Sequence, residues 1–256
     1  MKPLLFSIFT LFLLSPTVAA GQESHEGRTF LKRIENNYAN NVIVELPNGK
    51  TDGMYNLNGK SAIEKLLFGQ FNAPVECYYD PSGEVSPNGP QGVRIYRDST
   101  ERWVMEVKRI PNFREVNAAS EREFPIRSIR WNEKLSDSET VEIRQRNREM
   151  AARQNEQRLD RYRVESQTVP LSDTLAARLY DRTVRTIDTY VSPGKPLMIC
   201  DGYSVVFRTV VGNDLWTFRI DNPTEEPERL SDLFRAMIAD VEAGRFDEAK
   251  YLDMLR

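Results

Sequence analysis

Two strand-turn-strand patterns, one in each half of the chain, restrict the fold more than any other part of the sequence. In the second half, apolar and polar residues alternate through YSVVFRTVV and, after a turn at Gly212-Asn213, through DLWTFRI. In the first half, GVRIYRDSTERWVMEVKRI alternates in the same way. Such alternation between turn residues is typical of antiparallel hairpins with one buried face. Both hairpins therefore need a layer that covers their apolar side.

Two amphipathic helices are predicted to supply that layer, one from Ser172 to Tyr190 and one from Leu230 to Ala243. Their apolar residues recur at the spacing of a core-facing stripe. These residues are Leu175, Leu179, Val184, Ile187 and Val191 in the first helix, and Leu230, Leu233, Phe234, Met237, Ile238 and Val241 in the second. The sequence thus predicts an α+β fold, in which antiparallel hairpins around Trp103 and Trp216 are covered by amphipathic helices.

The first hairpin is predicted to have one solvated face. Val93, Ile95, Trp103, Met105 and Val107 fall on one side of it, and Arg94, Glu106 and Lys108 fall on the other. Further strands are predicted in VIVEL, PVECYY, YRVESQTV and KPLMIC. Short helices are predicted for 61–68 and, from the spacing of Phe30, Leu31, Ile34 and Tyr38, near the start of the mature chain.

A charged helix divides the chain into two α+β lobes. Ser136 and Glu139 form a capping box, and few apolar residues follow, so 136–161 is predicted to be a solvated helix between lobes 21–135 and 162–256. Its acids and bases stand four residues apart, as in Glu142-Arg146 and Glu149-Arg153. The lobes share the order helix, strand, hairpin, which fits either two related αββ units or two independent uses of a common arrangement.

The first twenty residues predict export. Lys2, the apolar run LLFSIFTLFLL and the small residues of SPTVAA have the order of a signal peptide cleaved after Ala20, and no later stretch is long and apolar enough to span a membrane. We therefore expect a soluble exported protein, periplasmic or extracellular. Export permits a disulfide between Cys77 and Cys200, but each could equally be a small apolar residue in the core.

The composition argues against several classes of function. Lys and Arg total 35, Asp and Glu total 38, and the chain has one His, which excludes the strong positive field of a general nucleic-acid binder and multi-His metal sites. Gly59-Lys60-Ser61 resembles the end of a phosphate-binding loop but lacks its upstream Gly, so a helix N-terminus is expected there. The loop that begins at Asp80 has alternating oxygen-bearing residues, yet Val85 stands where a calcium loop needs Gly. We expect no cofactor and no metal.

Few residues could perform acid-base or nucleophilic chemistry. His25 lies in the mature N-terminal tail, and Ser192 and Lys195 are separated by Pro and Gly, which exclude the helix that would bring them together. Asp201, Asp214 and Asp221 lie near strand ends, where two of them could serve as acid and base in glycoside hydrolysis. Asp is also an ordinary turn residue, so no catalytic residue is assigned.

A resemblance supports the prediction of export without adding an activity. The segments NGPQGVRIYRD, YRVES with PLSDTLAARLY, and CDGYSVVF before the last helix resemble a pattern in uncharacterised exported proteins of Bacteroides-type bacteria. This leaves two functional hypotheses. The first is an exported, non-catalytic binding or interaction protein with an unidentified protein or glycan partner, contacted through the loop from Asp80 to Gly92. The alternative is a carboxylate-dependent hydrolase acting on cell-envelope or dietary glycans.

Overall fold

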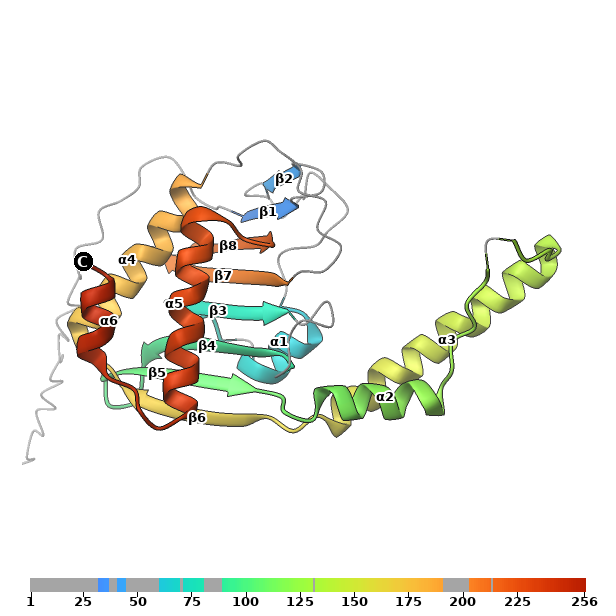
Figure 1. The fold of residues 1–256 in the computed structure, drawn as a ribbon, viewed down its shortest axis with the longest axis horizontal. Coiled ribbons are helices and arrows are strands. Elements are labelled where there is room, and N and C mark those ends of the chain that lie inside the picture. The colour runs from blue at the N-terminus through green and yellow to red at the C-terminus, as the bar shows by residue number, and fades with distance from the viewer. Residues whose placement is uncertain are drawn as a thin grey trace, which may run out of the picture.

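The computed structural model describes residues 32–36, 41–44, 60–69, 71–80, 89–130, 132–190, 203–212 and 214–256. The expected signal peptide, His25, the KPLMIC segment with Cys200, and most of the loop after Asp80 lie outside these residues. The described part has the predicted α+β fold, in which helices pack against one antiparallel sheet (Figure 1). Among its helices, none is long and apolar enough to cross a membrane.

The sheet has eight strands in the order β2-β1-β8-β7-β3-β4-β5-β6. The strands are β1 (Lys32–Asn36), β2 (Asn41–Val44), β3 (Val75–Asp80), β4 (Gln91–Arg97), β5 (Trp103–Arg109), β6 (Glu165–Pro170), β7 (Ser204–Val211) and β8 (Asp214–Asp221). Neighbouring strands are antiparallel except β1 and β8, which are parallel. Both predicted hairpins are confirmed, as β4–β5 and β7–β8.

The helix predicted around Ile34 is wrong, because this segment is strand β1. Its backbone pairs with β8 on one side and with β2 on the other. Short apolar runs fit either a helix or a strand, and here the pairing with an existing strand decides between them.

The helices α4 (Asp173–Thr189), α5 (Glu225–Glu242) and α6 (Glu248–Met254) lie on one face of the sheet (Figure 1). The main core fills the space between these helices and the strands. It contains Leu175, Leu179 and Ile187 from the first predicted stripe, the whole second stripe, and Trp216, whose side chain is 1% exposed. The prediction that these two helices cover the apolar side of the hairpins is confirmed.

The opposite face is covered by α1 (Ala62–Phe68), which begins at a capping box formed by Ser61 and Glu64. Gly92 allows this packing, since a Cβ atom there would lie 2.7 Å from the ring of Phe68 and 2.6 Å from the carbonyl oxygen of Cys77. The prediction of a solvated face on the first hairpin is therefore wrong. The side chains of Arg94 and Glu106 are only 14% and 11% exposed.

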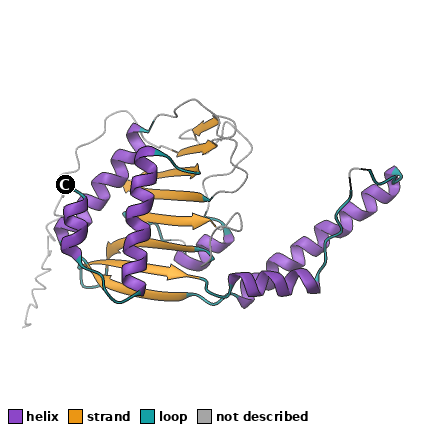
Figure 2. Ribbon diagram, viewed as in Figure 1, coloured by secondary structure: helices purple, strands orange, loops and turns teal. Residues whose placement is uncertain are grey.

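Two helices form an arm that projects from the sheet (Figures 1 and 2). The arm consists of α2 (Phe113–Glu123), the connection 124–136 and α3 (Asp137–Arg161). The helix α3 begins at Ser136 with the predicted capping box, and Gln154 is its one buried residue. The sequence predicted neither α2 nor α6.

The segments expected to form two lobes contribute to one sheet. Strand β3 of the first half pairs with β7 of the second half from Val75↔Thr209 to Asp80↔Ser204. The main core also draws residues from both halves. Whether the two halves are related units stays a prediction.

Candidate functional site

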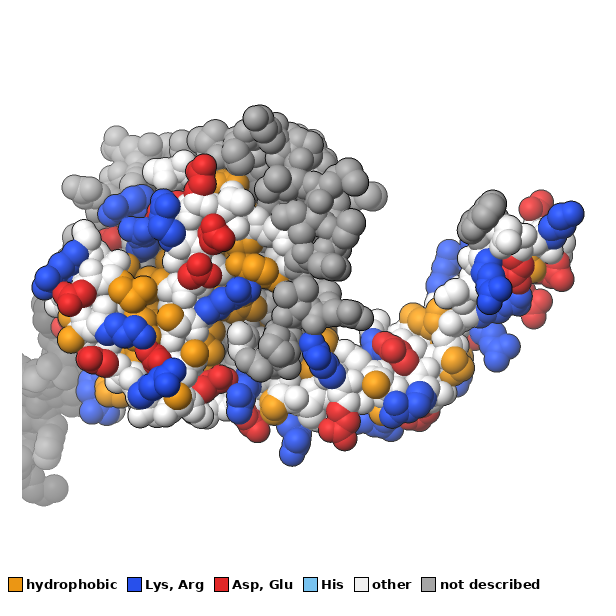
Figure 3. Space-filling view, in the orientation of Figure 1, with side chains coloured by type: hydrophobic (Ala, Val, Ile, Leu, Met, Phe, Trp, Pro, Cys, Tyr) orange, Lys and Arg blue, Asp and Glu red, His pale blue; other side chains and the backbone are white. Residues whose placement is uncertain are grey.

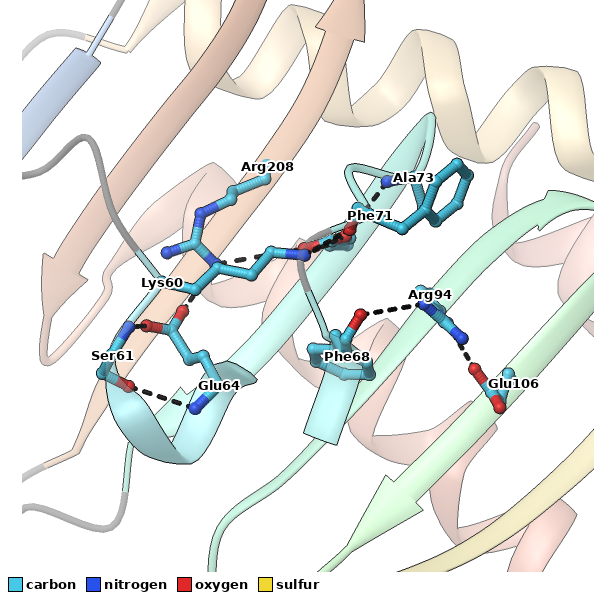
Figure 4. A network of polar contacts seen from close by, with 10 residues as sticks. Lys60, Ser61, Glu64, Phe68, Phe71, Ala73, Arg94, Glu106 and Arg208 are labelled. Carbon is cyan, nitrogen blue, oxygen red and sulfur yellow. Dashed lines mark hydrogen bonds and ion pairs between the residues drawn. The ribbon is translucent and has the colours of Figure 1, made fainter. Parts of the chain in front are cut away.

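A row of polar residues crosses six strands on the face beneath α1. Register pairs the row from β6 to β8 as Thr168↔Glu106, Glu106↔Arg94, Arg94↔Glu76, Glu76↔Arg208 and Arg208↔Thr217. Each charged residue therefore stands beside opposite charge on the neighbouring strands. Together with Lys60 and Glu64 from the α1 segment, these residues form what we call the charged row (Figure 4).

Glu76 stands at the centre of the charged row and is 1% exposed. Its Oε1 accepts hydrogen bonds from Lys60 Nζ at 2.8 Å and from the backbone N–H of Ala73 at 3.0 Å. Lys60 also donates to the carbonyl oxygen of Phe71 at 2.5 Å. Burial lowers the pKa of Lys60, and the adjacent Glu76 carboxylate opposes this shift.

The capping box of α1 is tied to the charged row through Glu64. Its carboxylate accepts the backbone N–H of Ser61 at 2.7 Å, and its Oε1 lies 2.5 Å from Nη1 of Arg208. The same Arg208 nitrogen lies 4.0 Å from Oε2 of Glu76. A buried arginine thus connects the start of α1 to two strands of the sheet.

Arg94 fixes the other end of α1. It pairs with Glu106 and donates to the carbonyl oxygen of Phe68 at 3.1 Å. Its guanidinium lies over the rings of Phe68, Phe71 and Tyr96, at 5.9, 5.8 and 4.8 Å from their centroids. These contacts combine charge pairing with cation–π attraction, so α1 is held at both of its ends.

The charged row holds structural elements together. The carboxylates of Glu64, Glu76 and Glu106 each pair with Arg or Lys from a different element of the fold. Four buried atoms of the row, Oε1 of Glu64, Oε2 of Glu76, Nη1 of Arg208 and Oγ1 of Thr217, have no hydrogen-bond partner among the described residues. Arg208 Nη1 nevertheless makes the ionic contacts described above.

The base of the arm is anchored beside α1. The rings of Phe113 and Tyr162 stack at 5.3 Å, and the Tyr162 hydroxyl donates to Asn117 Oδ1 at 2.6 Å. Both rings pack against a small core that includes Phe68 of α1 and Val206 of β7. The arm is therefore continuous with the polar side of the sheet.

Beyond its base, the arm no longer contains α2, which ends at Glu123. The amide of Gln154 donates to the carbonyl oxygen of Phe124 at 2.6 Å, which places the end of α2 beside the middle of α3. Farther from the sheet, only the connection 124–136 of the described chain lies beside α3. There Asn147 exchanges two hydrogen bonds with the backbone of Arg127, at 3.0 and 2.8 Å. The distal half of α3 thus lies mostly in solvent.

The distal arm carries a pocket and exposed aliphatic side chains. The pocket has a volume of about 500 Å³. Its lining consists of Pro125, Ile126, Arg127, Leu135, Glu139, Glu142, Ile143, Arg146 and Asn147. Ile126, Ile129 and Val141 are 45%, 38% and 62% exposed. Along the arm, apolar side chains are interspersed with acidic and basic ones (Figure 3). Exposed aliphatic side chains beside a pocket are one feature of surfaces that bind other proteins.

Of the three aspartates considered for catalysis, only Asp221 has its side chain in the described part of the chain. Asp221 accepts from the Ser204 hydroxyl and lies 3.9 Å from Arg219. Asp201 and the Asp214 side chain are outside the described residues, so the hypothesis of a carboxylate pair is untested. Lys60 and Ser61 precede and cap α1, as expected of a helix N-terminus.

Cys77 is fully buried in the main core, and burial raises the pKa of its thiol to about 12. Cys77 is a free, buried thiol in the structure, which fits the alternative of a small apolar core residue rather than a disulfide with Cys200. Cys200 itself lies outside the described residues. Within the described ranges, no group of three or more His, Cys, Asp or Glu side chains is placed to hold a metal ion.

The sequence did not predict the charged row or the arm as sites. The signal for the row was weak but present, since Glu76 and Arg208 each interrupt an otherwise apolar strand. The signal for the arm was the long polar helix 136–161. Comparison with known proteins adds no name to either site, because no family model, curated protein or solved structure matches the chain.

Proposed function

We propose that this is an exported binding protein that engages a protein partner through its arm and does not transform that partner. The observation that carries the proposal is the exposure of Ile126, Ile129 and Val141 on a projecting element. Covering exposed apolar side chains with a partner removes apolar surface from water, which favours binding at such positions.

The division of the molecule supports the same proposal. Helices α4, α5 and α6 pack on one face of the sheet and the short α1 packs on part of the other, with a core on each side, so the sheet can serve as a rigid scaffold. The arm begins at the stacked rings of Phe113 and Tyr162 and extends away from the sheet (Figure 2). Recognition residues carried on projecting elements of a rigid scaffold are a common arrangement in binding proteins.

The proposed export rests on residues 1–20, with their order of charge, apolar run and small residues. The resemblance to exported proteins of Bacteroides-type bacteria agrees with it. Intact-mass measurement of the protein from its producing cells tests this part. We expect a species that begins at Gly21, and a full-length cytoplasmic species would contradict it.

Photo-crosslinking tests the role of the arm. A photoreactive amino acid is placed at Ile129 in the arm, which is 38% exposed, or, as a control, at Met254 on α6, which is 55% exposed and therefore at least as accessible. Irradiation in an envelope extract of the producing cells is expected to give a discrete protein adduct from position 129 and none from position 254. Equal labelling at both positions, or no adduct at 129, would contradict binding through the arm.

A hydrolysis screen on cell-envelope and dietary glycans tests the alternative. Turnover that Asp201→Asn or Asp214→Asn abolishes would replace the binding proposal with the hydrolase. No turnover, together with an adduct at position 129, is the result that we expect.

A further inference from the structure

We infer that the partner of the arm is a second copy of this chain, with the two α3 helices antiparallel about a two-fold axis between Arg146 and Glu149. This inference rests on the proposed function, because it takes the arm as the binding surface and names its occupant. Four charged residues carry the argument. They are Glu142, Arg146, Glu149 and Arg153, and all four are exposed.

These four residues form one stripe along α3. Their spacing of four, three and four residues keeps them on a single face of a helix, and their charges alternate along it. The intrahelical pairs expected from this spacing do not form, and none of the four makes an ion pair with another residue that the structure describes. Glu149 makes one long hydrogen bond, accepting from Gln145 at 3.4 Å. The stripe is therefore available to a partner along its length.

The order of these four charges is self-complementary when the two helices are antiparallel, although Glu139 and Glu156, the next exposed residues of the stripe, then stand opposite each other as like charges. When two copies lie antiparallel about the stated axis, Arg146 stands opposite the partner's Glu149, and Glu142 stands opposite the partner's Arg153. Symmetry repeats both pairs, as in any isologous interface. A parallel arrangement in register would instead place like charges opposite each other, which is unfavourable. The stripe thus specifies both the partner and its direction.

The same contact covers apolar surface. Glu142 and Arg146 also line the distal pocket, together with Ile126, Leu135 and Ile143. A second helix laid along the stripe would therefore lie against the mouth of this pocket and cover the exposed Ile126. Exposed ion pairs contribute little free energy by themselves, so the aliphatic residues would supply affinity while the charges set the orientation.

Charge reversal at the axis tests the inference. The mass of the purified protein is measured by sedimentation equilibrium over a concentration series, at low and high salt. We expect a monomer–dimer equilibrium that weakens with salt. Arg146→Glu alone and Glu149→Arg alone should each raise the dissociation constant about tenfold or more, because each change alters two symmetric contacts. The double variant Arg146→Glu/Glu149→Arg should recover dimerisation, since each new charge again faces its opposite.

Arg144→Glu is the matched control. It makes the same change of charge at an exposed position two residues from Arg146, which a helix turns to the far side of α3. Its dissociation constant should equal that of the parent protein. Circular dichroism of each variant separates loss of pairing from loss of the helix.

A monomer at every concentration would overturn the inference, as would a double variant that pairs no better than the single variants. The crosslinking experiment keeps this failure separate from failure of the proposed function. An adduct at position 129 with the mass of two chains supports self-association. An adduct with a different protein, beside a monomeric parent, would keep the arm as a binding surface and reject the second copy as its occupant.

Discussion

The two faces of the sheet are covered in different ways, although the same strands form both. Toward α4 and α5, strands β3 and β7 present Val75, Cys77 and Phe207, and apolar packing closes this face. Toward α1, the same strands present Glu76 and Arg208, and charge pairing closes that face. One alternating pattern therefore produced two buried layers of opposite chemistry.

This difference has consequences for stability and for uniqueness. Apolar packing is non-directional and tolerates small shifts, whereas a buried ion pair is favourable only at good geometry. The short helix α1 packs Leu67 and Phe68 into a small apolar core, and the directional contacts of Glu64 and Arg94 fix its position on the sheet. We expect the apolar face to provide most of the stability and the charged row to fix α1.

The largest effect is expected on the apolar face. Trp216→Ala removes one of the largest fully buried side chains and should lower the free energy of unfolding by about 3–5 kcal/mol, measured by chemical denaturation. Val141→Ala, at a position 62% exposed, should change it by less than about 0.5 kcal/mol. A near-neutral Trp216 variant would show that this face is not the main source of stability.

On the charged face, Glu76→Gln should lower the free energy of unfolding by about 2–4 kcal/mol, because it leaves Lys60 buried without its anionic partner. The double variant Lys60→Met/Glu76→Met should be more stable than the single one, since it removes both charges together. If the single and the double variant lose the same free energy of unfolding, the loss comes from altered packing and not from an unpaired buried charge. The proposed difference between the two faces would then be wrong.

The apolar face was the predictable part of the fold. Its residues repeat at helical spacing in α4 and α5 and at period two in the hairpins, so each element carries its own signal. The charged row has no such signal, because each member looks like the polar residue of a half-solvated strand. Glu76 and Arg208 become neighbours only through the pairing of β3 with β7, two strands far apart in the sequence.

The arm was half predictable. The capping box at Ser136 and the absence of apolar residues indicated a long solvated helix. The helix α2 was missed because its Asn112 cap makes no side-chain hydrogen bond and its buried residues are Val116 and Ser120 alone. Its partnership with α3 depends on polar contacts such as Asn117 with Tyr162, which no apolar pattern reveals.

Asp240 is a buried charged residue on the otherwise apolar side of the sheet. Its carboxylate pairs with Lys250 and Arg245 and accepts from the Tyr251 hydroxyl, which joins α5 to α6. Asp240→Asn should lower the free energy of unfolding by about 1–2 kcal/mol at neutral pH. The effect is smaller than that of Glu76→Gln because Lys250 and Arg245 are largely in water.

The same site predicts a dependence on pH. Hydrogen bonds from Lys250, Tyr251 and Arg245 hold the pKa of Asp240 well below its usual range. As the pH falls, the Asp240 carboxylate is therefore protonated in the unfolded chain before it is protonated in the folded protein. The stability that Asp240 contributes is lost below about pH 4. Between pH 5 and 3, Asp240→Asn should lose less stability than the parent. Asp253→Asn, in an exposed pair with Arg256, should follow the parent curve.

The smallest effect on the free energy of unfolding is expected at the arm, which has neither an extensive apolar core nor a buried row of ion pairs. Tyr162→Phe removes the hydroxyl that donates to Asn117 but keeps the stack on Phe113, so it should cost about 0.5–1.5 kcal/mol. Because the arm contacts the sheet only at its base, this loss should stay local: amide hydrogen exchange should accelerate in α2 and α3 and remain unchanged in β3 and β7. Tyr96→Phe is the matched control, since its ring contacts Arg94 and no hydroxyl bond is lost. Faster exchange throughout the sheet would instead show that the arm and the charged face unfold as one unit.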